Sequence, residues 1–185
     1  MKVTPLDIPE ILLIEPKVFG DARGYFVETF QVERYAQAGI GERFVQDNLS
    51  CSTRGTLRGL HLQHPASQGK LVYVVEGKVF DVAVDVRVGS PSFGKWTGAH
   101  LSSRDHRQMY IPPGFAHGFC VVSEQALFAY KCTEVYLPQN EMGVAWNDPG
   151  LAIPWPVSEP IISEKDQRFP PLAKIDPARL PRWKG

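Results

Sequence analysis

Short apolar stretches recur along the chain, separated by glycine, proline, asparagine and aspartate. Frequent breaks of this kind are typical of a sandwich or barrel of β-strands. The pattern predicts strands at residues 11–14, 25–30, 44–50, 58–63, 71–75, 79–86, 96–101, 108–111, 118–122, 126–132 and 144–146. One helix is expected at residues 32–38, ending near Gly39. The fold class is therefore expected to be mostly β, with a few short helices.

The two central strands of this series are separated by Glu76-Gly77, which predicts a two-residue hairpin loop. In that register Lys70 pairs with Ala83, and Asp81 lies diagonally across from Lys70, about 7–8 Å away on the same face. Because side chains alternate between the faces of a strand, Lys70, Asp81 and Asp85 would share one face. The other face would be apolar and aromatic. A charged face beside an apolar one predicts a pocket.

Composition excludes several classes of protein. The 185 residues carry 20 basic and 20 acidic side chains, so the net charge is +0 and no attraction to nucleic acid or membrane surfaces is expected. No apolar run approaches the roughly 20 residues needed to cross a bilayer. The N-terminal residues, broken by prolines and acids, do not resemble a signal peptide. Three cysteines without metal-binding spacing suit a reduced, cytoplasmic protein.

Residues 1–185 have the length of one domain, and no linker divides them. Eight of the 16 prolines fall within residues 149–185. Apolar residues such as Leu151, Trp155 and Leu172 are interleaved with them, so this stretch is not low-complexity. We expect a single domain in which residues 149–185 form a proline-rich, ordered wrap over the barrel.

The segment Gly59–Gly77 resembles the first motif of the cupin superfamily, in which two histidines and a glutamate bind a metal. His61 matches the first histidine, but Gln63 and Lys70 replace the second histidine and the glutamate. A lysine ammonium has no lone pair to offer a metal. Residues 112–119 resemble the second cupin motif. The resemblance implies a cupin-type jelly roll, and the replaced ligands lead us to expect no metal.

Nine blocks spread over nearly the whole chain carry a closer resemblance. They are Glu15–Gly24, Gln46–Asn48, Arg58–His61, Gln68–Lys70, Phe80–Asp85, Tyr110–Pro112, Gly114–Phe119, Tyr130–Lys131 and Ser163–Asp166. In this order they resemble the dTDP-4-dehydrorhamnose 3,5-epimerase family. The resemblance implies an isomerase without cofactor that inverts C3 and C5 of dTDP-4-dehydro-6-deoxy-D-glucose, in dTDP-L-rhamnose biosynthesis. Together with the apolar surface of the predicted sheet, it also implies a homodimer.

Four residues are candidates for the chemistry. His61 is a natural proton acceptor at cellular pH, and it needs a partner to fix its tautomer. The resemblance gives that part to Asp166, although Asp81 and Asp85 remain alternatives on the sequence alone. Lys70 would stabilise an enolate beside a carbonyl oxygen. The resemblance makes Tyr130 the general acid on the opposite face of the enolate, as inversion requires. The catalytic candidates are His61, Tyr130, Asp166 and Lys70.

Further residues are candidates for binding the sugar nucleotide. Arginine forks suit phosphate oxygens, and polar residues on one strand face suit a base edge or sugar hydroxyls. Alternative interpretations are an ion pair within a turn for Arg23 and a place in the core for Phe26. The substrate-binding candidates are Arg23, Phe26, Glu28, Gln46, Asn48, Arg58, Lys70, His117, Glu141 and Lys165.

One position departs from the family pattern. Val135 stands where an aromatic residue can lie near the active-site tyrosine. This leaves open an epimerase that inverts only C3 or only C5, or a ketoisomerase on a related dTDP-4-keto-6-deoxy sugar. A cupin that binds a nucleotide sugar without turnover is a further alternative.

Overall fold

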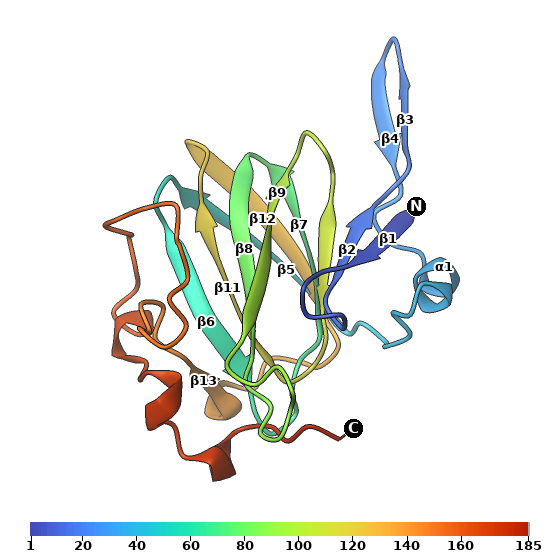
Figure 1. Cartoon of the computed structure of the whole chain (residues 1–185). Coiled ribbons are helices and arrows are strands. Elements are labelled where there is room, and N and C mark those ends of the chain that lie inside the picture. Colours follow the sequence, from blue (N-terminus) through green and yellow to red (C-terminus); the bar gives the residue numbers. More distant parts are fainter. Residues whose placement is uncertain (185) are drawn as a thin grey trace.

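In a computed structural model, which describes residues 1–184, two antiparallel sheets pack face to face (Figure 1). In spatial order, the first sheet contains β1 (Lys2–Pro5), β2 (Leu12–Glu15), β10 (Gln108–Ile111), β7 (Lys70–Glu76), β12 (Gln125–Cys132) and β5 (Gln46–Thr53). The second contains β13 (Glu141–Gly143), β6 (Leu57–Gln63), β11 (Phe115–Val121), β8 (Lys78–Asp85) and β9 (Trp96–Ser102). The predicted mostly β, jelly-roll fold class is therefore confirmed.

Helices are few and short. The helix α1 (Val32–Gln37) agrees with the predicted one, and the side chain of Gln31 caps it by accepting a hydrogen bond from the Arg34 backbone N–H at 2.6 Å. The remaining helices are single 3₁₀ turns: η1 (Pro138–Asn140), η2 (Asp166–Arg168), η3 (Leu172–Lys174) and η4 (Pro177–Arg179). None of the helices within residues 1–184 is long and apolar enough to span a membrane.

The core between the two sheets is built from alternate residues of facing strands. Val72 and Val74 of β7 meet Val79 and Ala83 of β8 in one buried cluster, together with Phe128 of β12. Fully burying a side chain of this size stabilises the fold by about 1.5–3 kcal/mol for valine and phenylalanine. Lys70 of β7 and Asp81 of β8 lie on the same strand faces as these core residues, so their side chains also point into the space between the sheets.

The predicted pairing of the two central strands is wrong. β7 pairs with β10 and β12, whereas β8 pairs with β11 and β9, so the chain passes from one sheet to the other at Gly77. Gly77 has a φ of +87°, and a Cβ there would lie 2.1 Å from the carbonyl oxygen of Gln125. Only glycine fits this corner. Lys70 and Asp81 therefore approach each other across the sandwich and not along one sheet.

Two smaller expectations are also corrected. The strand predicted at residues 144–146 is β13, at residues 141–143. Val144 still exchanges two backbone hydrogen bonds with Leu60 just beyond it. Asp85 does not join Lys70 and Asp81, because its carboxylate is bonded to Arg87 and to nearby serine hydroxyls.

A two-stranded hairpin stands apart from the sheets. It consists of β3 (Val18–Asp21) and β4 (Gly24–Val27), which pair only with each other. Figure 1 shows it projecting from the body of the molecule beside β1 and β2. Its large apolar residues are exposed, with 52 % for Phe19, 61 % for Tyr25 and 68 % for Phe26.

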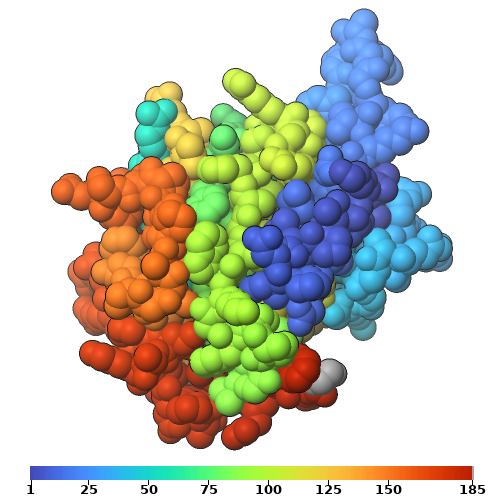
Figure 2. All heavy atoms as spheres, viewed as in Figure 1, coloured from blue at the N-terminus to red at the C-terminus, as the bar shows by residue number. Residues whose placement is uncertain are grey.

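The segment after Pro149 covers the outer face of the second sheet. Leu151, Leu172 and Ile175 are buried against Val82 and Val84 of β8. Figure 2 shows the orange and red atoms of this segment spread over one side and the base of the molecule. This course carries η2, and with it Asp166, to the edge of β6.

Candidate active site

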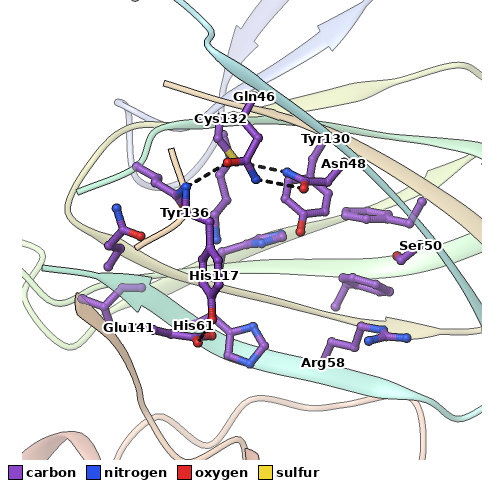
Figure 3. A pocket seen from close by; sticks show the side chains of 16 residues that line it. Gln46, Asn48, Ser50, Arg58, His61, His117, Tyr130, Cys132, Tyr136 and Glu141 are labelled. Atoms are coloured by element: carbon purple, nitrogen blue, oxygen red, sulfur yellow. Dashed lines mark hydrogen bonds between the residues drawn. The ribbon is translucent and has the colours of Figure 1, made fainter. Parts of the chain in front are cut away.

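A cavity of about 330 Å³ opens between the two sheets (Figure 3). It is lined by strands of both sheets and by residues just before and within β13. Eight predicted site residues are among the lining: Gln46, Asn48, Arg58, His61, Lys70, His117, Tyr130 and Glu141. The sequence-based candidates from distant parts of the chain therefore meet in one cavity.

A bulge in β6 brings Arg58 and His61 to the same cavity. Strict alternation would place these two residues on opposite faces, because three positions separate them. Opposite them on β11, the partners Phe119 and His117 are only two positions apart. One extra residue on β6 therefore resets its register. Gly59 makes this possible, because its φ is +121° and a Cβ there would lie 2.6 Å from the Cα of Gly118.

Asp166 is the carboxylate that contacts His61. Nε2 of His61 lies 2.8 Å from Oδ1 of Asp166, and Oδ2 accepts the backbone N–H of Gly59 at 3.1 Å. Burial acts to raise the pKa of Asp166, but the hydrogen bonds from His61 and Gly59 and the charge of His61 bring it below its usual value. Asp166 is therefore an anion that favours a proton on Nε2. This leaves Nδ1 of His61 with a lone pair for a substrate.

Lys70, Asp81 and His117 form a buried cluster of ionisable groups. Both carboxylate oxygens of Asp81 lie 3.0 Å from Nε2 of His117, so Asp81 orients His117 and not His61. Burial raises the pKa of Asp81 and lowers that of His117. Burial also lowers the pKa of the Lys70 ammonium, against the charges of Cys132, Asp81 and Glu141, which act to raise it. The cluster places the Lys70 side chain in a buried position on the wall of the cavity.

Tyr130 lies on the wall opposite His61. It belongs to β12 of the first sheet, and His61 belongs to β6 of the second. Figure 3 shows the two side chains on opposing sides of the cavity. Burial raises the pKa of the Tyr130 phenol, with a smaller contribution from Cys132. The phenol therefore keeps its proton at neutral pH and is able to act as an acid.

Glu141 joins two side chains at the rim of the cavity. Its Oε2 accepts hydrogen bonds from Tyr136 Oη and from Lys165 Nζ, both at 2.5 Å. Burial acts to raise the pKa of Glu141, but these two partners lower it overall. Lys165 directly precedes Asp166, so this contact also ties η2 to the rim.

Three predicted binding residues lie away from this cavity in their own chain. Arg23 is in the turn of the β3–β4 hairpin and forms an ion pair with Asp21 at 2.6 Å. Phe26 is exposed on the same hairpin. Glu28 follows it and is paired with Arg34. All three lie on or directly after the hairpin, and none of them lines the cavity that contains His61.

The sequence reasoning missed several lining residues that alternation could have found. Ser50 continues the face of Gln46 and Asn48 on β5, and Cys132 continues that of Tyr130 on β12. Tyr136 could not be found in this way, because it lies outside any strand.

Gln63 occupies the position of a cupin metal ligand but is engaged elsewhere. Its amide nitrogen donates to the carbonyl oxygens of Ala66 and Val135, and its amide oxygen accepts the backbone N–H of Leu137. Gln63 therefore fastens two loops beside the cavity. No group of three or more His, Cys, Asp or Glu side chains within residues 1–184 is arranged to hold a metal ion.

Comparison with known proteins gives one consistent family. The family described as dTDP-4-dehydrorhamnose 3,5-epimerase matches residues 5–174. The protein of that name from Shigella flexneri is 53% identical over 168 residues, which are 90% of this chain and 93% of that protein. A dTDP-4-dehydrorhamnose 3-epimerase from Streptomyces niveus is 42% identical over 182 residues, 97% of this chain and 88% of that one.

A solved structure extends the similarity to three dimensions. It is the crystal structure of dTDP-6-deoxy-D-glucose-3,5-epimerase from Legionella pneumophila Philadelphia 1 in complex with dTDP-4-keto-L-rhamnose. The TM-score is 0.97 and the identity 52%, and the match covers 100% of this chain and 99% of that one.

Proposed function

The chain belongs to the dTDP-4-dehydrorhamnose 3,5-epimerase family, as its sequence blocks predict, and we propose that it inverts C3 and C5 of dTDP-4-dehydro-6-deoxy-D-glucose. The product is dTDP-4-dehydro-L-rhamnose, and the reaction serves dTDP-L-rhamnose biosynthesis. One observation carries the proposal: His61 with Asp166, and Tyr130, lie on opposite walls of a cavity that Lys70 also lines. Inversion needs a base on one face of a planar enolate and an acid on the other.

The first half of the reaction forms the enolate. Nδ1 of His61 removes the proton from the carbon next to the C4 ketone, and the electron pair of that C–H bond moves onto the C4 oxygen. Asp166 stabilises the imidazolium through the hydrogen bond to Nε2. The Lys70 ammonium lies in a buried position where it stabilises the enolate oxygen more strongly than it would in water.

The second half delivers a proton from the other side. The Tyr130 hydroxyl gives its proton to the carbon, the enolate electrons form the new C–H bond, and the ketone returns. His61 then loses its proton to solvent and the tyrosinate regains one, so the enzyme is restored. Because the ketone is already present in the substrate, the scheme uses no redox step. We expect no cofactor or metal to be needed.

We also propose a homodimer in which the β3–β4 hairpin of one subunit reaches the cavity of the other. The hairpin exposes Phe19 and Phe26, and the substrate-binding candidates Arg23, Phe26 and Glu28 lie away from the cavity of their own chain. In a dimer, the hairpin of one subunit would bring these residues to the cavity of the other subunit. The outer face of the first sheet also exposes Leu49 and Val75, at 65 % and 48 %, and supports pairing of subunits.

We place the protein in the cytoplasm, where thiols stay reduced. Its cysteines Cys51, Cys120 and Cys132 are all unbridged, and two of them are buried. This supports a reducing compartment.

The experiment that tests the reaction is incubation with dTDP-4-keto-6-deoxyglucose in deuterium oxide. We expect deuterium at both C3 and C5 and a product with both centres inverted, as read by NMR. Absence of any deuterium uptake would mean a binding protein without turnover.

A second candidate is inversion at one centre only. By the family resemblance, Val135 stands where an aromatic residue can lie near the active-site tyrosine, and the Streptomyces niveus relative is named a 3-epimerase. Label and inversion confined to C3 in the same experiment would favour this candidate over the first.

A further inference from the structure

The inner face of β5 presents a row of polar side chains to the cavity and its margin: Gln46, Asn48, Ser50 and Ser52. Three of them have protein partners. Gln46 donates to Asn48 Oδ1 at 3.0 Å, the Asn48 amide donates to the sulfur of Cys132 at 3.7 Å, and Ser52 accepts from Arg58 Nε at 3.1 Å. Ser50 has no hydrogen-bond partner among the described residues, although its Oγ is buried. It lines the active-site cavity.

The nearest neighbours of Ser50 across the sheet are aromatic rings. Ser50 faces Phe128 in the β5–β12 register, and Phe128 is stacked on Phe119 with 4.1 Å between ring centroids. A hydroxyl carries one donor and two acceptor sites, and leaving them unused in a buried position costs free energy. Figure 3 shows Ser50 at the end of the cavity toward Arg58. The guanidinium of Arg58 is a donor only, with N–H groups beyond the one bonded to Ser52.

We propose that Ser50 is a substrate-binding residue whose Oγ exchanges a hydrogen bond with an oxygen of the bound sugar diphosphate. The inference rests on the proposed function, because that function supplies the ligand. A hexose hydroxyl and a diphosphate oxygen both fit, since Ser50 donates to either. The Ser50 hydroxyl, which has no partner among the described residues, becomes part of ligand recognition.

The test compares Ser50→Ala with Ser52→Ala. Ser52 is the matched control for stability, because it lies two positions away on the same face but has a partner. Ser50→Ala is expected to leave the thermal unfolding midpoint of the free protein unchanged or higher, because it removes a buried hydroxyl that has no partner. Ser52→Ala is expected to lower it. If Ser50 made a structural hydrogen bond within the protein, both substitutions would lower the unfolding midpoint.

Ligand binding is the second readout. By calorimetry with dTDP-L-rhamnose, which lacks the reactive ketone, Ser50→Ala should bind about 3- to 10-fold more weakly than the unmodified protein. The same titration with dTDP distinguishes the two oxygens. Weakening for dTDP-L-rhamnose alone assigns a hexose hydroxyl, and equal weakening for both ligands assigns the diphosphate.

Two results would overturn the inference. One is unchanged affinity of Ser50→Ala for both ligands. The other is a loss of stability in Ser50→Ala as large as in Ser52→Ala, which would mean that the protein itself satisfies Ser50. Deuterium uptake by the unmodified protein is measured beside these titrations. If uptake is present while Ser50→Ala binds normally, this inference fails and the proposed function stands.

Discussion

The cavity between the sheets and the β3–β4 hairpin carry different halves of the predicted site. In the cavity, acid, base and cation come from strands whose backbone is paired on both sides, and Asp166 is tied to both His61 and Gly59. The hairpin has two short strands paired only with each other, with its large apolar residues exposed. A two-stranded hairpin is marginally stable alone in water.

This difference separates chemistry from recognition. The candidate catalytic groups of His61, Lys70 and Tyr130, whose positions must be fixed to within a fraction of an ångström, lie on the packed sheets. The residues predicted to contact the nucleotide lie on or beside the hairpin, whose large apolar side chains are exposed in this chain. We therefore expect changes at His61, Lys70 and Tyr130 to reduce turnover and changes in the hairpin to weaken binding.

The largest effect is expected from His61→Ala. With no base to form the enolate, both epimerisation and solvent deuterium exchange should fall by about 10²–10⁴-fold. NMR of the sugar in deuterium oxide measures both. His64→Ala is the control, since His64 lies just outside the cavity lining. If exchange persists in His61→Ala, His61 is not the base, and proton removal occurs at another residue.

Lys70→Met keeps the bulk of the side chain and removes its charge. Because the enolate charge exists only beyond the ground state, kcat should fall by about 10²–10³-fold while KM changes little. Lys78→Met, on the exposed start of β8, should leave steady-state rates unchanged. Near-normal turnover in Lys70→Met would show that the ammonium is not at the C4 oxygen.

Tyr130→Phe should affect inversion and solvent deuterium exchange differently. It removes the phenolic hydroxyl and keeps the packing of the ring, so His61 is still able to take a proton and return deuterium to the same face. Inversion should fall sharply while some label still enters the sugar. Equal loss of exchange and inversion would instead make Tyr130 necessary for forming the enolate. If inversion stays near normal, Tyr136 becomes the next candidate for the acid.

Arg23→Ala tests the hairpin. A charged hydrogen bond to the ligand contributes about 1.5–3 kcal/mol, so KM should rise by roughly 10- to 100-fold with a smaller change in kcat. Arg54→Ala, an exposed arginine beyond the cavity lining, serves as the control.

Mixing Arg23→Ala chains with His61→Ala chains shows where the hairpin acts. If it acts on the second subunit, each mixed dimer contains one site with both residues intact, and activity returns. If activity does not return on mixing, the hairpin serves its own chain and the two regions are not divided between subunits.

The smallest effect is expected from chelation. Prolonged dialysis against EDTA should leave the rate unchanged, because Gln63 and Lys70 replace two of the three cupin ligands. Loss of activity that returns with a stoichiometric metal would contradict this.

Outside the bulge in β6, alternation along the strands predicts which face a residue occupies, but it does not predict which strand lies beside it. Lys70 and Asp81 do point into the same space, yet they belong to different sheets, because a glycine corner and a hairpin turn look alike in sequence. The bulge at Gly59 was equally hidden: period-two reasoning alone separates Arg58 from His61. Asp166 was assigned through the family resemblance, since no local pattern relates it to His61.

The contact between His61 and Asp166 spans 105 positions of the chain. At ribosomal rates of about 5–20 residues per second, Asp166 is made roughly 5–20 s after His61. A nascent chain that has completed β6, β7 and β8 therefore already holds the base and the ammonium, but not the carboxylate that orients the base. Premature termination before η2 yields a chain that lacks this carboxylate. Residues 149–184, which are synthesised after the strands of both sheets, therefore supply the carboxylate that contacts His61.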